Sequence, residues 1–301
     1  MKSEIFLRAK DYDLAATLDS GQVFRWRQEN ELWTGIVGKY RVRLAQEKDG
    51  ILATTDAIVE NWDWLRNFLQ TDVDLESILR NFPDDEPINN AVRACRGLRI
   101  LRQDPWECLA SFILSATKQI VQIQQIVAQL CECFGEPLAN GNGQDGEHYA
   151  FPTAEKIAGV KEPDLRNCKM GFRAPNLLAT AKEIAEGKLN LKVLRNLPYL
   201  EAREKLMTLR GVGGKIADCV LLFAYGFDSA FPVDVWVERA LQTLYFPRRR
   251  VSDKRLRRFA AMHFGPHAGY AQQYLFHYMR TKTKPRSNTR KTRQPALLGA
   301  G

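Results

Sequence analysis

The sequence predicts an α+β protein, in which an N-terminal antiparallel β-sheet domain is followed by an all-helical domain. Residues 1–57 alternate between apolar and polar side chains, whereas the spacing of apolar residues is helical from Ile58 onward. At 301 residues the chain is long enough for two domains. We expect a sheet domain with flanking helices over 1–100, a helical domain over 101–280, and a basic, disordered tail over 281–301.

Five segments at the start of the chain are predicted to be strands. They are Glu4–Arg8, Gln22–Arg27, Leu32–Val37, Tyr40–Gln46 and Ile51–Thr54. Turn residues separate them, most clearly at Gly38-Lys39 and at Lys48-Asp49-Gly50. Because short turns join antiparallel neighbours, we expect these segments to form a single antiparallel sheet.

The remaining pattern is helical. Asp74 is expected to cap a helix over Leu75–Asn81, and Asp104-Pro105 to open one long helix that ends near Gly135. A loop is predicted over Leu138–Glu147. Further helices are predicted at 153–159, 162–168, 173–186, 191–195, 199–209, 215–225, 234–245, 252–264 and 267–280.

Composition and charge indicate a soluble, intracellular protein that binds a polyanion. Hydrophobic residues make up 45% of the chain and charged residues 26%, and we find neither a membrane-spanning apolar run nor a signal-peptide core. Six units of the net charge of +9 lie in the tail, at Lys282, Lys284, Arg286, Arg290, Lys291 and Arg293. Attraction to DNA explains this charge better than a merely solvated tail does.

A glycine-rich hairpin is the most informative motif. Residues Gly211–Gly214 join two predicted helices, and such a tight turn needs the positive φ values and close ligand approach that glycine allows. The amides of Gly211 and Gly213 are suited to bind a backbone phosphate. Two common nucleotide-binding loops are excluded, because Leu209 and Ile216 stand where those motifs require glycine or a hydroxyl residue.

Two ionisable residues follow the hairpin. Lys215 lies in the first turn of its predicted helix, a position that suits an amine attacking a sugar carbon. Asp234 follows Pro232-Val233 as the predicted N-cap of Val235–Leu244, and its carboxylate is suited to stabilise a sugar cation and to move protons. Either residue alone is explained more simply, as a solvated lysine or a plain cap. Together with the hairpin they indicate an enzyme that cuts a base from its sugar.

The segment from Leu209 to Cys219, Leu-x-Gly-Val-Gly-x-Lys-x-Ala-Asp-Cys, followed later by Pro-Val-Asp, resembles the helix-hairpin-helix DNA glycosylase superfamily. Within it, the sequence is similar to the 8-oxoguanine DNA glycosylase branch. Four further segments match that family in order, at Ser20–Trp26, Leu101–Pro105, Gly171–Ala174 and Gly269–Gln272. The resemblance covers roughly residues 5–280 and implies that a helix-hairpin-helix glycosylase domain follows the sheet domain.

The resemblance implies a base-excision repair enzyme, a bifunctional DNA glycosylase and AP lyase, that flips 8-oxoguanine or a related oxidised purine out of double-stranded DNA. Lys215 matches the lysine that expels the base and forms a Schiff base, after which β-elimination nicks the strand. Asp234 matches the motif aspartate. We expect a monomer that needs no cofactor and holds no metal in its site. A structural monovalent cation on the hairpin carbonyls also fits the family pattern.

Five positions match the base pocket of the family. Gly21 matches the glycine whose carbonyl accepts the N–H that distinguishes 8-oxoguanine from guanine, although alone it would be assigned to a turn. Gln272 and Phe276, spaced i and i+4, match the glutamine that contacts the Watson–Crick edge and the aromatic that stacks on the flipped base. Without the resemblance, Phe276 would be assigned to the core. Cys219 matches the opposite wall, and Phe223 replaces a methionine.

Two positions match the family's DNA contacts and three depart from them. Phe172 matches the aromatic wedge that fills the emptied stack, and Arg173 an arginine that hydrogen-bonds the orphaned base. Thr117 replaces an asparagine that probes the gap, Gln122 a second cytosine-reading arginine, and Trp236 a histidine near the lesion's phosphate. Because a bidentate arginine contributes ~1–3 kcal/mol of discrimination, we expect weak selectivity for cytosine opposite the lesion.

Three alternatives compete with this interpretation. A monofunctional alkylated-base DNA glycosylase of the same superfamily uses the aspartate without a lysine nucleophile, and Lys215 argues against it. A catalytically silent helix-hairpin-helix DNA-binding module would leave Asp234, Gln272 and Phe276 unexplained as a set. An iron–sulfur endonuclease needs a cysteine cluster, but no Cys-x-x-Cys pair occurs and no cysteine follows Cys219.

Overall fold

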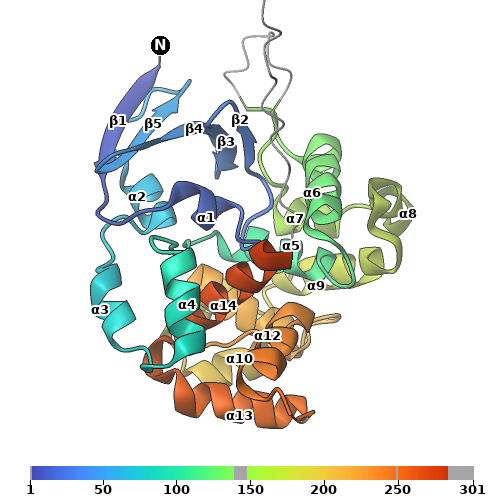
Figure 1. The fold of residues 1–301 in the computed structure, drawn as a ribbon. Helices are drawn as coiled ribbons and strands as arrows, with labels where there is room; N and C mark the ends of the chain where they lie inside the picture. The colour runs from blue at the N-terminus through green and yellow to red at the C-terminus, as the bar shows by residue number, and fades with distance from the viewer. Residues whose placement is uncertain (1, 139–147, 249, 284–301) are drawn as a thin grey trace, which may run out of the picture.

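In the computed structural model, which describes residues 2–138, 148–248 and 250–283, a sheet covers one end of a helical body (Figure 1). The strands follow the order β1-β5-β4-β3-β2, and every neighbouring pair is antiparallel. Their bounds are β1 Ser3–Arg8, β2 Arg27–Glu29, β3 Leu32–Val37, β4 Tyr40–Glu47 and β5 Gly50–Thr55. The predicted α+β fold class is therefore confirmed. Most of the predicted tail, and residues 139–147 of the predicted loop, lie outside the described residues.

One predicted strand is wrong. The alternating pattern predicts a strand over Gln22–Arg27, but β2 begins only at Arg27. The residues before it form a loop whose side chains are buried for other reasons. Trp26 is 3% exposed and lies against Gly35, where an added Cβ would come within 2.3 Å of the indole ring. Alternation in this segment therefore reflects side chains that anchor a loop, not a pleated strand.

Helices make up most of the rest. They are α1 Leu14–Leu18, α2 Asp63–Leu69, α3 Leu75–Arg80, α4 Glu86–Ala94, α5 Pro105–Leu114, α6 Ile120–Phe134, α7 Ala154–Ala158, α8 Glu162–Leu165, α9 Ala174–Ala185, α10 Tyr199–Met207, α11 Gly214–Val220, α12 Val235–Tyr245, α13 Asp253–His263 and α14 Ala268–Thr283. Leu221–Tyr225 is π-helical, and Gly171–Arg173, Leu191–Asn196 and Gly265–His267 are 3-10 turns. Arg166–Met170 is a kinked segment in which Cys168 and Lys169 leave the helical conformation. Among these described helices, none has the length and apolar character that crossing a membrane requires.

The single long helix predicted from Asp104-Pro105 to Gly135 is instead two helices. α5 ends at Leu114, where the hydroxyl of Ser115 donates to the Phe112 carbonyl oxygen at 2.7 Å. Thr117 then adopts a left-handed backbone conformation with φ of 58°, which is unfavourable for a β-branched residue. The break is therefore not explained by local helix propensity, and its cause lies in the tertiary contacts described below.

Two hydrophobic cores support the fold. The first lies between the sheet and the helices α1 and α2, and its strand residues are Leu7, Trp33, Val42, Leu44, Ile51 and Ala53. Because side chains alternate along a strand, these residues share one face of the sheet. The second and larger core fills the helical body, where α14 packs against both α4 and α12.

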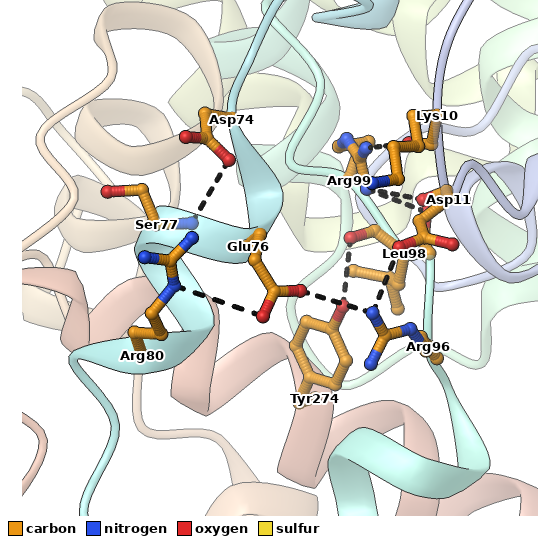
Figure 2. A network of polar contacts seen from close by, with 11 residues as sticks. Lys10, Asp11, Asp74, Glu76, Ser77, Arg80, Arg96, Leu98, Arg99 and Tyr274 are labelled. Atoms are coloured by element: carbon orange, nitrogen blue, oxygen red, sulfur yellow. Dashed lines mark hydrogen bonds and ion pairs between the residues drawn. The ribbon is translucent and has the colours of Figure 1, made fainter.

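The segment between α4 and α5 joins the two cores, and Figure 2 shows the polar contacts around it. Arg99 is 1% exposed, and its guanidinium donates to the carbonyl oxygens of Lys10 and Asp11 at 2.8 and 2.9 Å. From the helical side, the hydroxyl of Tyr274 donates to the Leu98 carbonyl oxygen at 3.2 Å. Through Leu98 and Arg99, these buried contacts connect α14 with the loop that precedes α1.

Candidate active site

A small cavity in the helical body is lined by residues from distant parts of the chain. The lining residues are Ser20, Gly21, Phe112, Lys215, Cys219, Phe223, Pro232, Asp234, Gln272, Gln273 and Phe276. The structure thus brings together every residue predicted for catalysis and for the base pocket. Sequence reasoning missed Ser20, Phe112, Pro232 and Gln273. Ser20 and Pro232 lie inside the matched motifs, but nothing in the apolar run of α5 separates Phe112 from ordinary core residues.

Lys215 is the second residue of α11 and is half-buried. Its Nζ lies 5.0 Å from the centroid of the Phe112 ring. Cys219, one turn further along the same helix, is 3% exposed. Burial raises the pKa of its thiol to about 12, although the neighbouring Lys215 acts in the opposite direction. Cys219 is therefore an uncharged wall of the cavity, and the amine beside it is the candidate nucleophile.

Asp234 is the N-cap of α12, as predicted. Its Oδ1 accepts a hydrogen bond from the Val237 amide at 2.8 Å. Burial raises the pKa of the Asp234 carboxyl above its ordinary value of 3.8, while the Val237 hydrogen bond and the charge of Lys215 act to lower it. The same carboxylate therefore caps a helix and places a negative charge near the lysine.

The cavity is small. Its volume is about 40 Å³, which is room for about one water molecule and too little for a purine base. Aromatic rings occupy the space, because Phe112 and Phe223 stack with centroids 5.6 Å apart and Phe276 is 9% exposed. A base can enter only if at least one of these rings moves.

Gly21 is required by its conformation and by its surroundings. Its φ is 78°, and an added Cβ would lie 2.9 Å from Ile120 Cδ1 and 3.4 Å from Phe276 Cε1. The next residue, Gln22, is fully buried, and its Oε1 accepts from the Leu101 amide at 2.8 Å. The loop that carries Gly21 is therefore fixed against the segment between α4 and α5. Gly21 is a wall of the cavity as well as a turn residue.

Gln272 carries an unsatisfied acceptor. It is 4% exposed, and its Oε1 is buried with no hydrogen-bond partner among the residues that the structure describes. Leaving such an atom unpaired costs about 1–3 kcal/mol. Its neighbour Gln273, by contrast, donates to the Ser20 carbonyl oxygen at 2.9 Å and so anchors α14 to the loop of Gly21. The geometry leaves Gln272 available for a donor on a ligand.

The matched segment Leu101–Pro105 connects two walls of the cavity. The side-chain amide of Gln103 donates to the Gln22 carbonyl oxygen at 2.7 Å. Its backbone amide donates to the Phe223 carbonyl oxygen at 2.8 Å. Gln103 was matched only as part of a motif, and the structure shows why a glutamine at this position is useful.

The glycines of the hairpin differ in what they allow. Gly211 has φ of 84°, and an added Cβ would lie 2.6 Å from the side-chain nitrogen of Asn176. Gly213 is the N-cap of α11, and a Cβ there would meet nothing within 4 Å. Gly211 is therefore fixed by packing, while Gly213 presents an open backbone at the start of the helix that carries Lys215.

Comparison with known proteins agrees with this geometry. The family model described as "8-oxoguanine DNA glycosylase, N-terminal domain" matches residues 4–109, and the model described as "HhH-GPD superfamily base excision DNA repair protein" matches residues 110–265. A probable N-glycosylase/DNA lyase of Methanothermobacter thermautotrophicus is 30% identical over an alignment of 304 positions. The alignment covers 90% of this chain and 94% of the relative.

Solved structures match along the same length. The 8-oxoguanine glycosylase/lyase of Clostridium acetobutylicum, in complex with double-stranded DNA containing cytosine opposite 8-oxoG, is 35% identical with a TM-score of 0.85, over 92% of this chain and 98% of that chain. MBOgg1, in complex with a low-affinity DNA ligand, is 33% identical with a TM-score of 0.88, over 93% and 96%. The chain belongs to the 8-oxoguanine DNA glycosylase family.

In this member of the family, three of the residues predicted at the DNA interface, Phe172, Arg173 and Thr117, form a second group. Phe172 is 59% exposed, and the guanidinium carbon of Arg173 lies 4.2 Å from its ring centroid. Arg173 itself is 3% exposed and donates to Ala116 O at 2.7 Å, to Thr117 Oγ1 at 2.5 Å and to Met170 O at 3.2 Å. These bonds hold Thr117 in its left-handed conformation. To contact a base, Arg173 has to release some of them.

The other two predicted DNA contacts lie apart from the cavity lining. Gln122 is in the first turn of α6, and its Oε1 accepts from the backbone amide of Gln119 at 3.2 Å. Trp236 is half-buried in the first turn of α12, with the guanidinium carbon of Arg239 5.1 Å from its ring centroid. Gln122 therefore caps its own helix, a role that the sequence comparison did not suggest.

Proposed function

We propose that this chain is a bifunctional N-glycosylase and DNA lyase that removes 8-oxoguanine, or a related oxidised purine, from double-stranded DNA in base excision repair. One observation carries the proposal. One small cavity contains an amine, a carboxylate and an unpaired buried acceptor, from Lys215, Asp234 and Gln272, with Gly21 and Phe276 completing its walls. The family membership and the names of the relatives support the same activity.

Recognition begins when the aromatic wall opens and the flipped base enters the cavity. The free Oε1 of Gln272 accepts an N–H from the Watson–Crick edge of the base. The Gly21 carbonyl accepts the additional ring N–H of the oxidised base. Phe276 then stacks on the base. A residue with a side chain at position 21 would prevent this close approach, because its Cβ would lie 2.9 Å from Ile120 Cδ1 and 3.4 Å from Phe276 Cε1.

Chemistry then follows from Lys215. Its Nζ attacks C1′ of the sugar through the nitrogen lone pair as the C1′–N9 bond breaks. The electron pair of that bond leaves with the base, and a proton passes from the new C–N nitrogen to the base. The Asp234 carboxylate stabilises the positive charge that develops on the sugar. Ring opening gives a Schiff base between Lys215 and C1′. Loss of a C2′ proton then expels the 3′ phosphate and nicks the strand.

Amino-acid side chains suffice for each of these steps, and none requires a cofactor. We also propose that the hairpin carbonyls hold a structural monovalent cation and that the enzyme is a monomer. We further propose that Phe172, Arg173 and Trp236 contact the DNA. Their support is the match of residues to the family and, for Phe172 and Arg173, the contact between them.

Borohydride trapping tests the proposed function. Wild-type protein is incubated with an 8-oxoguanine duplex and borohydride, beside Lys215→Gln and the matched control Lys205→Gln, an exposed lysine on α10. We expect a covalent adduct with wild type and with the control, and none with Lys215→Gln. Release of free base without an adduct would indicate a monofunctional glycosylase. Neither product would indicate a DNA-binding module without catalysis.

A further inference from the structure

A second concentration of positive charge lies outside the tail. Residues 246–262 contain seven arginines and lysines and a single acidic residue. This segment and the tail each carry a net charge of +6, whereas the net charge of the whole chain is +9. The remainder of the chain is therefore on balance acidic. Most of the segment is α13, which lies with α10 and α12 at the end of the molecule opposite the sheet (Figure 1).

A buried carboxylate organises part of this charge. Asp218 on α11 is 1% exposed. Its Oδ1 accepts from Arg203 Nε on α10 at 2.7 Å and from the Tyr199 hydroxyl at 2.8 Å, and its Oδ2 accepts from Arg257 Nη1 on α13 at 3.0 Å. Two guanidinium groups therefore share a single carboxylate, and the cluster keeps a net positive charge. The side chains of Arg203 and Arg257 are 23% and 33% exposed, so both reach solvent.

Arg203 lies directly against the hairpin. An added Cβ on Gly214 would be 2.2 Å from Arg203 Nη2, so the guanidinium covers the backbone of Gly214. This contact explains the third glycine of the hairpin, whose φ is not positive. Asp218 accepts from one of the five N–H groups of Arg203. The ion pair with Asp218 accounts for the position of Nε but not for that of Nη2, which lies over the hairpin.

The exposed side of α13 continues this charge. Lys254 lies one turn before Arg257 and Arg258, so the three side chains are neighbours on the helix surface. Lys254 and Arg258 are exposed, whereas Leu256 and Ala260 point into the core. We call the set Arg203, Lys254, Arg257 and Arg258 the hairpin-flanking surface.

We propose that the hairpin-flanking surface binds the phosphodiester backbone of the same DNA duplex, beyond the phosphates that the hairpin contacts. The inference rests on the proposed function, because it assumes that the duplex lies on the hairpin. Exposed guanidinium groups of one sign suit phosphate oxygens, which accept charge-assisted, often bidentate hydrogen bonds. A protein partner fits less well, because the cores of protein interfaces are depleted in charge. Contacts of this kind give affinity without sequence preference.

The salt dependence of DNA binding tests the proposal. Binding to a lesion-free fluorescent duplex is measured between about 50 and 200 mM salt. Lys254→Gln/Arg258→Gln leaves Asp218 untouched, and Arg203→Gln/Arg257→Gln removes the guanidinium pair. Arg80→Gln/Arg93→Gln, on α3 and α4, removes the same charge elsewhere. We expect each of the first two variants to bind about tenfold more weakly and to reduce the slope of log affinity against log salt by about 1–2, unlike the control.

Excision measured beside binding separates the outcomes. At subsaturating enzyme, the single-turnover rate on an 8-oxoguanine duplex should fall with the loss of affinity for Lys254→Gln/Arg258→Gln. It should stay within about twofold of wild type for the Arg80→Gln/Arg93→Gln control. Equal salt slopes for wild type, both variants and the control would overturn the proposal. If wild type does not excise the lesion at all, the proposed function fails, but the slopes on lesion-free DNA still decide whether this surface binds a duplex. Circular dichroism is used to check that Arg203→Gln/Arg257→Gln is folded.

Discussion

The cavity around Lys215 and the group around Arg173 differ in how the protein holds them. In the cavity, buried hydrogen bonds from distant segments fix the walls that carry Gly21 and Phe223, as Gln22 and Gln103 show. Most of its residues also match the family. Around Arg173, by contrast, Phe172 is largely exposed, and Thr117 departs from the family pattern.

This difference separates two tasks of the enzyme. Removal of a base requires groups held within fractions of an ångström, and the cavity walls supply them. We propose that the second group selects the partner base; there, the donors of Arg173 are bonded to backbone and to Thr117. We infer that changes in the cavity abolish chemistry, whereas changes in the second group adjust selectivity and stability.

The largest effect is expected for Asp234→Asn. Asparagine keeps the N-cap acceptor for the Val237 amide, so the change removes the charge without removing the cap. We expect the single-turnover excision rate to fall by about 10²–10³-fold, as for the loss of a preorganised electrostatic group. A matched Asp74→Asn variant, which changes the N-cap of α3, should excise normally. An active Asp234→Asn enzyme would show that the carboxylate is only a cap.

The pH dependence of the same residue sharpens the comparison. Because burial raises the pKa of Asp234 above 3.8, protonation should begin to slow excision at a higher pH than for an ordinary aspartate. Protonation of Asp234 has the opposite effect on stability, because it favours the folded state. The folded state holds the proton more tightly, so this contribution to the free energy of unfolding is present below 3.8 and is lost as pH rises through the raised value. Both dependences should be absent from Asp234→Asn.

Gln272→Leu is expected to act on stability and recognition in opposite directions. Leucine of similar volume removes the buried acceptor that has no partner in the described part of the chain. The free energy of unfolding should rise by about 1 kcal/mol, while affinity for a lesion duplex falls about 10–100-fold. Gln273→Leu, which breaks the bond to Ser20, should instead destabilise. Denaturant titration and duplex binding measure the two effects, and a destabilised Gln272→Leu protein would contradict this account.

A smaller effect concerns the partner base. Excision opposite C, A, G and T should differ by less than about tenfold in wild type, since the second cytosine-reading arginine is replaced by Gln122. Gln122→Arg should raise the preference for cytosine by about tenfold. Because Gln122 also caps α6, Gln122→Ala serves as the control that loses the cap without adding an arginine. A strict preference for cytosine in wild type would contradict the prediction.

Contiguous motifs made most of the site predictable, and tertiary contacts account for what was missed. Lys215 and Asp234 stand in short motifs whose chemistry is visible in the sequence. Phe112 lies in an apolar run that resembles any core helix, and only its position below Lys215 gives it a role. The strand prediction over Gln22–Arg27 was wrong because loop anchors alternate as strand residues do. Likewise, the break between α5 and α6 depends on a bond between residues 56 positions apart.

That bond leads to the smallest of the expected effects. Thr117 has φ of 58°, a conformation that costs about 1–2 kcal/mol for most residues and less for asparagine. Thr117→Asn should therefore raise the free energy of unfolding by about 1 kcal/mol, because the asparagine oxygen can still accept from Arg173. Thr208→Asn, at a position with φ of −70°, is the control and should not stabilise.

Denaturant unfolding of both variants decides whether the second group stores backbone strain. A stabilised Thr117→Asn protein would mean that the threonine is retained at a cost in stability, as is common where a backbone conformation serves function. The same variant should then be compared with wild type for excision opposite each base. If Thr117→Asn is instead destabilised, the hydroxyl bond to Arg173 outweighs the strain, and the left-handed turn is maintained by that bond alone.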